Sequence, residues 1–224
     1  MADLLKQTIG ELLREKAQTL TDHEAVVYPD LGIRYTYKEF YELCGKVAKA
    51  LIGIGVQKGE HIAVWASNVP EWLLLQFGSA RAGAVLVTVN TSYQESELEY
   101  LLQQSDSTTL FLIDNFKGSS YVNMVKNIVS HRKGQVPYLK HLIYLGEQEP
   151  PEGMKSWSDL LGIAESVSDE ELAEREASLH HGDVINMQYT SGTTGFPKGV
   201  MLTHDNIVNN GYQIAQAMNL TSKD

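Results

Sequence analysis

The sequence predicts an α/β fold in which helices are layered on a parallel sheet, and three features support this prediction. Short apolar segments alternate with longer helical ones through the middle of the chain, as in repeated strand–helix–strand units with right-handed crossovers. Residues 85–89 and 110–113 are apolar throughout, which is typical of strands covered on both faces. Near residue 195 a glycine-rich connection joins two further short strands, which adds a hairpin to the layered sheet.

The N-terminal part of the chain is expected to form a helix, two strands and a second helix. Apolar residues from Leu5 to Leu13 recur at helical spacing between charged ones. Two short strands, 25–28 and 33–36, follow around a turn. Thr36 and Glu39 have the spacing of a capping box, and Cys44 lies in the apolar stripe of the helix that follows, so we expect it to be a buried hydrophobic residue.

The repeating units come next. Strands are expected at residues 61–66, 85–89, 109–113 and 141–145, with helices between them at 70–82, 95–104 and 121–131. The first of these helices has Asn68 as its expected cap, Pro70 in its first turn and Gly83 after its end. Its apolar side chains indicate burial on most sides, and Trp65 and Trp72 are interpreted as core residues, with a ligand cleft as the alternative.

Residues 146–178 differ in composition from the rest of the chain, because they are rich in prolines and acidic residues. Ser168 and Glu171 have capping-box spacing before a short acidic helix. We interpret this stretch as a surface excursion without chemistry. His180 and His181 are adjacent and therefore point apart, so they do not predict a metal site.

The segment from Tyr189 to Gly199, YTSGTTGFPKG, has the composition of a phosphate-binding loop. Glycines allow backbone N–H groups to form an anion-binding nest, hydroxyls add donors, and Lys198 adds a positive charge. Residues 184–189 alternate in polarity and residues 199–203 are short and apolar, so the loop joins two strands. A Walker A loop has a different glycine spacing and leads into a helix. The alternative is a glycine-rich turn that binds no ligand.

After this loop, Thr203 is expected to cap a helix over residues 205–218. His204 and Asn206 lie in its first turn, near the strand that leaves the loop. We interpret both as capping and packing residues, with a supporting role in the phosphate site as the alternative.

Bulk composition limits the classes of function. The chain has 224 residues with 43% apolar content, which suffices for one sizeable core. A net charge of −10 and the absence of a basic stripe argue against nucleic acid as a partner. The single cysteine fits a reducing compartment, and the acidic residues near the N-terminus are atypical of transit peptides, so we expect a cytoplasmic protein without a transmembrane segment.

The loop segment resembles the signature of the adenylate-forming superfamily, which comprises acyl-CoA synthetases, luciferases and the adenylation domains of peptide synthetases. Two weaker motifs precede it in the expected order: residues 35–40 (YTYKEF) resemble the first core motif, and residues 82–90 (AGAVLVTVN) resemble the second. The latter pattern is most similar to that of fatty acyl-CoA synthetases with medium- or long-chain preference.

This resemblance implies a two-step reaction in which a carboxylic acid, expected to be a fatty acid, reacts with ATP to give an acyl-adenylate and is then transferred to coenzyme A. It also implies that the loop holds the β- and γ-phosphates, with Lys198 as the catalytic residue and the hydroxyl of Thr190 beside Mg²⁺. The phosphate-binding residues implied in this way are Thr190, Ser191, Gly192, Thr193, Thr194, Gly195 and Lys198.

Members of the superfamily are much longer than 224 residues. The adenine, ribose and C-terminal catalytic motifs of the family are not found in the sequence. Residues 1–224 are therefore expected to be the N-terminal portion of the AMP-binding domain, without its remainder or the small C-terminal domain, and to be inactive alone. Two alternatives stay open: an adenylating enzyme for an aryl or amino acid, and a nucleotide-binding module without catalysis. The sequence does not predict an oligomeric state.

Overall fold

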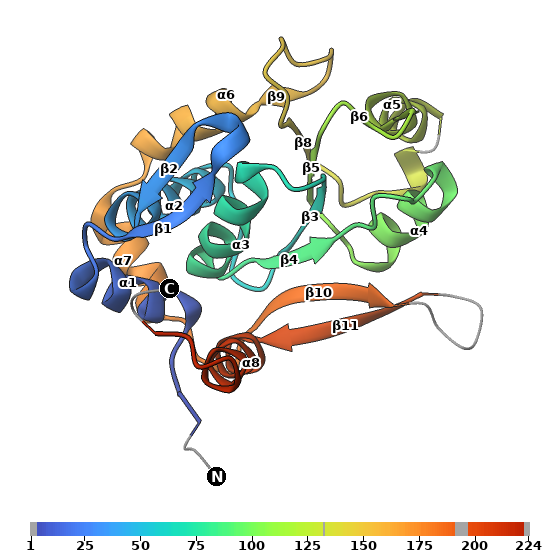
Figure 1. The fold of residues 1–224 in the computed structure, drawn as a ribbon. Coiled ribbons are helices and arrows are strands. Elements are labelled where there is room, and N and C mark those ends of the chain that lie inside the picture. Colours follow the sequence, from blue (N-terminus) through green and yellow to red (C-terminus); the bar gives the residue numbers. More distant parts are fainter. Residues whose placement is uncertain (1–3, 132, 191–196, 222–224) are drawn as a thin grey trace.

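A seven-stranded sheet forms the centre of the protein in a computed structural model that describes residues 4–131, 133–190 and 197–221 (Figure 1). Its strand order is β11-β10-β4-β3-β5-β8-β9. Neighbouring strands are parallel except at one edge, where β10 and β11 form an antiparallel hairpin. The predicted α/β class is confirmed. The strands are β3 (His61–Trp65), β4 (Val85–Thr88), β5 (Thr109–Leu112), β8 (His141–Tyr144), β9 (Lys155–Ser156), β10 (Val184–Thr190) and β11 (Lys198–Thr203).

Helices cover both faces of this sheet (Figure 1). On one face lie α2, α3 and α6, with α7 packed against α2 and α3, while α4 and α5 lie on the other face. The first and last helices, α1 and α8, pack together beside the hairpin. The helices are α1 (Ile9–Thr19), α2 (Tyr37–Gly53), α3 (Pro70–Ala82), α4 (Glu95–Gln104), α5 (Tyr121–His131), α6 (Trp157–Ile163), α7 (Asp169–Ala177) and α8 (His204–Ala217).

The central strand β3 shows why residues 62–65 are apolar without interruption. Side chains alternate between the two faces of a strand, so both faces need apolar residues when both are covered. Ile62 and Val64 pack into the cluster under α2 and α3, whereas Ala63 and Trp65 pack into the cluster under α4 and α5. All four side chains are completely buried. This confirms Trp65 as a core residue.

Most of the residues predicted to begin or end helices do so in the structure. Thr36 and Thr203 each cap a helix through a complete capping box. Helix α3 begins at Pro70 and ends before Gly83, whose φ of 74° is in the left-handed region that favours glycine. The expected cap at Asn68 is wrong. Val69 occupies the N-cap position without a side-chain hydrogen bond, because Asn68 lies one residue too early.

The interpretation of residues 146–178 as a surface excursion is also wrong. Strand β9 extends the main sheet by pairing with β8. Leu160 and Leu172 are buried in the core under α2, although acidic residues surround them in the sequence. Glu176 on α7 accepts a hydrogen bond from the Arg81 side chain on α3 at 2.5 Å, and Arg81 is only 3% exposed. The segment is therefore an integral layer of the fold, held by apolar packing and a buried ion pair.

Two small hairpins complete the described fold. The antiparallel pair β1 (Glu24–Tyr28) and β2 (Ile33–Thr36) confirms the two predicted strands, and the predicted turn between them contains the short 3₁₀ helix Pro29–Leu31. The second pair, β6 (Asn115–Phe116) and β7 (Ser119–Ser120), follows β5 and was not predicted; two further 3₁₀ helices are Lys133–Gln135 and Ala164–Ser166. Over the described part of the chain, every helix is too short or too polar to cross a membrane.

Candidate functional site

The candidate site lies at the carboxyl edge of the sheet, where β10 leads into the glycine-rich loop. Because β3, β4, β5, β8 and β10 are parallel, their carboxyl ends meet at this one edge. The order of the strands reverses at β3, two strands from β10 along the same edge, since β4 and β5 flank β3 on opposite sides. Open α/β sheets bind ligands at the carboxyl ends of their strands, near such a reversal.

The hairpin places two of the predicted site residues opposite each other. Thr190, the last residue of β10, is paired in register with Lys198, the first residue of β11. Both residues are exposed, and the loop connects them at the tip of the hairpin. Among the described residues, no carboxylate forms an ion pair with Lys198. The predicted phosphate-binding residues Ser191, Gly192, Thr193, Thr194 and Gly195 lie outside the described residues.

Tyr189 anchors the strand that leads into the loop. Its ring is half-buried in the cluster under α4, and this burial raises the pKa of its hydroxyl to about 12. Across the hairpin, Gly199 faces Tyr189 in register. A Cβ atom at Gly199 would lie 3.0 Å from Met187 Sδ and 3.4 Å from Tyr189 Cζ. A larger residue at this position would therefore force the Met187 side chain to shift, whereas glycine lets both side chains pack against the opposite strand without displacement.

Two buried aromatic residues fix the segment that follows β4, next to the candidate site. Trp65, at the end of β3, stacks on Tyr121 from α5 with ring centroids 3.6 Å apart. The indole N–H of Trp65 donates to the Asn90 carbonyl at 3.0 Å, and the Tyr121 hydroxyl donates to the Thr91 carbonyl at 2.6 Å. Both carbonyls follow β4, the strand that pairs with β10. These contacts hold the second core motif in place at the carboxyl edge.

Sequence reasoning identified Trp65 as a core residue, with a ligand cleft as the alternative, and did not identify Tyr121 as its stacking partner. The available signal was Tyr121 itself, which begins an otherwise apolar helix face. A tyrosine that is buried there needs a hydrogen-bond partner for its hydroxyl. The partner comes from a segment 30 residues earlier in the chain. The sequence alone does not indicate which carbonyl that is.

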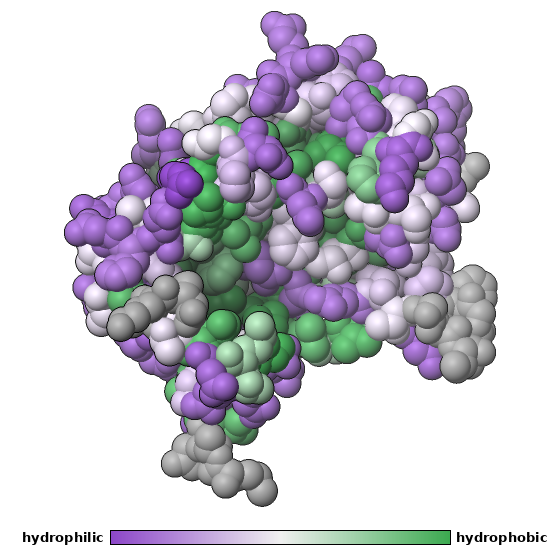
Figure 2. Space-filling view, in the orientation of Figure 1, coloured by the Kyte–Doolittle hydropathy of each residue, from purple (hydrophilic) through white to green (hydrophobic). Residues whose placement is uncertain are grey.

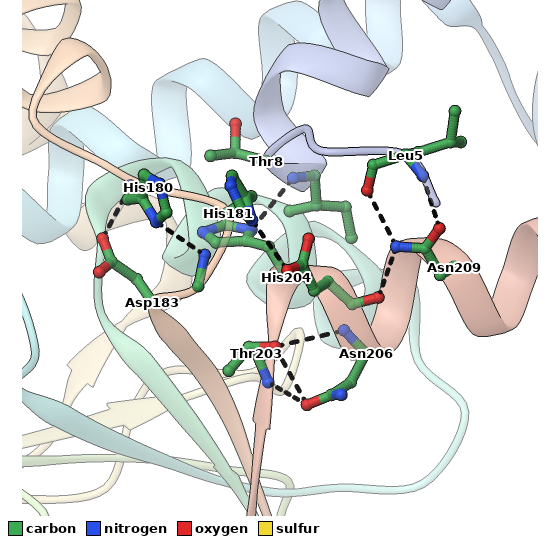
Figure 3. A network of polar contacts seen from close by, with 12 residues as sticks. Leu5, Thr8, His180, His181, Asp183, Thr203, His204, Asn206 and Asn209 are labelled. Carbon is green, nitrogen blue, oxygen red and sulfur yellow. Dashed lines mark hydrogen bonds and ion pairs between the residues drawn. The ribbon is translucent and has the colours of Figure 1, made fainter. Parts of the chain in front are cut away.

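His204 directly follows β11, at the end of the hairpin away from the loop, and Figure 3 shows its surroundings. Its buried Nδ1 accepts a hydrogen bond from the Ile9 backbone N–H at 3.0 Å. Burial lowers the pKa of the imidazole to about 4, although the nearby carboxylates of Asp183, Asp205 and Glu11 oppose this shift. The length of β10, ~20 Å, separates His204 from the loop. This favours the predicted packing role over a supporting role in the phosphate site.

The network around His204 ties the N-terminal segment to the base of the hairpin (Figure 3). Asn209 on α8 accepts from the Leu5 backbone N–H at 2.8 Å and donates to the Leu5 carbonyl at 2.9 Å. His181 pairs with Asp205 at 2.8 Å. Its ring centroid lies 4.0 Å from that of His180, so the expectation that these two side chains point apart is wrong. Within the described ranges, no cluster of three or more histidine, cysteine or carboxylate side chains could hold a metal ion. The hydrogen bonds of His204 and Asn209 attach residues 5–9 to the base of β10 and β11, and the network in this way acts as a structural anchor.

Comparison with known proteins gives matches along nearly the whole chain. The family of AMP-binding enzymes matches residues 13–224. YngI of Bacillus subtilis (strain 168), provisionally assigned as an acyl-CoA synthetase, is 52% identical over 100% of this chain and 42% of its own length. The mitochondrial medium-chain acyl-CoA ligase ACSF2 of Danio rerio is 34% identical over 93% of this chain and 36% of its own length.

Among solved structures, the chain is similar to the anthranilate CoA ligase AuaEII in complex with anthranoyl-AMP. The TM-score is 0.70 and the identity is 26%, over 90% of this chain and 35% of that chain. The chain thus spans less than half the length of each of these three proteins.

Proposed function

The chain belongs to the AMP-binding enzyme family, and on that premise we propose that it is the N-terminal portion of the adenylation domain of an acyl-CoA synthetase. The proposed enzyme is an AMP-forming acid–thiol ligase that uses ATP, a fatty acid and coenzyme A. One observation carries the proposal: the hairpin with the YTSGTTGFPKG segment lies at the carboxyl edge of a parallel sheet, where this fold class binds ligands. The names of YngI and ACSF2 support the reaction class.

In the first step a carboxylate oxygen attacks the α-phosphorus of ATP, the bond to the bridging oxygen of the β-phosphate breaks, and pyrophosphate leaves. In the second step the thiol sulfur of coenzyme A attacks the acyl carbonyl, its proton passes to the surroundings, and AMP leaves. The first step depends mainly on positioning and charge neutralisation. The exposed Lys198 ammonium supplies a positive charge at the tip of the hairpin, beside the hydroxyl of Thr190.

The remaining phosphate contacts in this proposal come from Ser191, Gly192, Thr193, Thr194 and Gly195. Mg²⁺, when bound with ATP, would neutralise phosphate charge. The Thr190 hydroxyl is an oxygen ligand of the kind that Mg²⁺ accepts, and Mg²⁺ at such sites is held largely by phosphate oxygens and water. Thr190 alone among the described residues at the hairpin tip would therefore contact the ion or its water shell.

An enzyme for an aryl or amino acid is the second candidate that the sequence left open. AuaEII, whose structure holds anthranoyl-AMP, acts on an aryl acid. The names of the more similar relatives, YngI and ACSF2, instead support an acyl-CoA ligase, and that of ACSF2 specifies medium-chain acids. We therefore retain a medium-chain fatty acid as the proposed substrate. The buried single cysteine supports the cytoplasm as the proposed compartment, which fractionation of cells would test.

The proposal is tested by ATP–pyrophosphate exchange with the full-length enzyme. We expect exchange that depends on a medium-chain acid, and no exchange by the 224-residue chain alone. Lys198→Ala should lower kcat about 10²–10³-fold, the range for removal of one group that stabilises transition-state charge. Lys126→Ala, which removes an exposed lysine from α5, is the matched control and should leave kcat unchanged. Equal kcat values for the Lys198 and Lys126 variants would refute the role of Lys198.

A further inference from the structure

A second cleft lies between α3, the β10–β11 hairpin and α8, and five of its lining residues carry carboxamides. We call it the amide cleft. It encloses about 710 Å³, within the usual range for small-molecule sites. Figure 2 shows this face of the molecule hollowed, with a band of hydrophilic surface across a largely hydrophobic hollow. The lining residues are Gln76 on α3, Asn186 and Gln188 on β10, Leu202 on β11, and Asn206, Ile207, Asn210 and Gly211 on α8.

Two residues that line this cleft, Gln76 and Asn186, each have one buried polar atom without a partner among the described residues. The Asn186 side chain, 1% exposed, donates through Nδ2 to Gln76 Oε1 at 3.2 Å. This leaves Asn186 Oδ1 as an unpaired acceptor and Gln76 Nε2 as an unpaired donor. Buried polar groups are almost always hydrogen-bonded in folded proteins, so the unpaired donor and the unpaired acceptor on two hydrogen-bonded side chains indicate a missing hydrogen-bond partner.

This conclusion does not depend on how the two amides are oriented. If both were turned over, Gln76 Nε2 would donate to Asn186 Oδ1, and one donor and one acceptor would again remain. A hydroxyl group satisfies such a pair with a single oxygen atom, because it donates and accepts at once.

The charge of the cleft restricts the ligand further. None of the described side chains that line it is ionisable, and Leu202 and Ile207 add hydrocarbon surface beside the amides. A phosphate or a carboxylate would find no opposite charge there. The cleft therefore suits a neutral hydroxyl group carried on a hydrocarbon chain.

The position of the cleft connects it with the phosphate loop. Asn186, Gln188 and Thr190 lie on one face of β10, since side chains alternate along a strand. The loop begins after Thr190, ~13 Å along the strand from Asn186. An acid whose carboxylate is activated at the loop can therefore direct its chain along this face of β10 into the cleft.

We propose that the amide cleft binds a hydroxyl group on the acyl chain of the substrate, through Asn186 and Gln76. This inference rests on the proposed adenylation activity and specifies its substrate class as hydroxylated medium-chain acids. Asn186 and Gln76 are then specificity-determining residues, whereas Lys198 and the loop serve every acid alike.

The test compares kcat/KM of the full-length enzyme for octanoic and decanoic acids and for their terminal-hydroxyl derivatives, by pyrophosphate release. We expect at least about a tenfold preference for one of the hydroxylated acids, because a site with buried hydrogen-bonding groups discriminates against an analogue without the hydroxyl. Gln76→Met and Asn186→Leu keep side-chain size and should each abolish this preference, because kcat/KM for the hydroxylated acid should fall to that for the plain acid of the same length. Gln103→Met, on the exposed surface of α4, is the matched control and should retain the preference.

The outcomes are distinguishable. Equal kcat/KM for plain and hydroxylated acids would overturn the inference and indicate that water alone fills the cleft, while the adenylation activity would stand. A Gln76→Met variant that loses activity equally with both kinds of acid would overturn it too, because the amide would then serve folding. No pyrophosphate release with any acid would overturn the proposed function itself, and this inference with it.

Discussion

His204 provides the most quantitative prediction, because its environment opposes protonation. The imidazole is fully buried, and Nδ1 accepts the hydrogen bond from the Ile9 N–H, so the ring must be neutral with its proton on Nε2. Nε2 has no partner among the described residues. Protonation of Nδ1 would remove the acceptor for Ile9 and place a charge in the core. We therefore expect α1 to detach from the hairpin base as the pH falls.

The size of the effect follows from the pKa of His204. It falls from 6.5 to about 4 in the folded chain, a difference of about 2.5. This corresponds to about 3 kcal/mol between the two protonation states. Because the folded pKa is the lower one, the unfolded chain binds more protons between these values, and stability is lost as the pH falls from 6.5 towards 4. Between about pH 7 and pH 5 the loss attributable to His204 is about 2 kcal/mol.

Urea denaturation at a series of pH values measures this loss. His204→Asn retains an acceptor near the Nδ1 position and cannot be protonated, so the variant should be less stable at neutral pH but should lose about 2 kcal/mol less on acidification. His23→Asn, which removes an exposed histidine, is the control and should follow the wild type. Amide exchange at Ile9 should speed up with falling pH, relative to the intrinsic rate, in the wild type only.

The reasoning would be refuted if the free energy of unfolding depended on pH in the same way for the wild type and for His204→Asn. In that case the carboxylates around the ring, Asp183, Asp205 and Glu11, would compensate for burial, and His204 would titrate near its ordinary pKa. Unchanged protection of the Ile9 amide at low pH would contradict the proposed detachment of α1 in the same way.

Three further predictions concern the packing around the site. Glu176→Ala leaves the buried Arg81 guanidinium without its carboxylate and should lower the free energy of unfolding by about 3–5 kcal/mol, as measured by denaturant unfolding. An unchanged denaturation midpoint would contradict a buried ion pair. Burial raises the pKa of the Cys44 thiol far above its usual range, so iodoacetamide should modify it only after denaturation, as mass spectrometry would show; rapid native labelling would contradict this. Gly199→Ala should destabilise the protein by about 1–3 kcal/mol through contact with Met187. Gly162→Ala, in open space on α6, should instead stabilise the protein by about 0.5–1 kcal/mol. Equal changes in melting temperature for the Gly199 and Gly162 variants would contradict a close contact between residue 199 and Met187.

Local signals in the sequence sufficed for most of the elements. Helices α3, α4 and α5 have the predicted bounds, and the capping boxes at Thr36 and Thr203 start their helices as expected. The hairpin that carries the loop was predicted from alternation before it and a short apolar run after it. These features depend on neighbouring residues along the chain, which interact in the same way before and after folding.

The arrangement of these elements, in contrast, could be known only from the tertiary structure. Strand β10 lies beside β4, β9 joins β8, Arg81 meets Glu176, and His204 receives the N–H of Ile9. Gln76 and Asn186, which form the amide cleft, are 110 residues apart in the sequence. Periodicity and capping patterns do not predict such contacts, because the partners are far apart in the sequence and meet only when the chain is folded. The sequence therefore predicts the phosphate loop, and the folded chain decides which surfaces surround it.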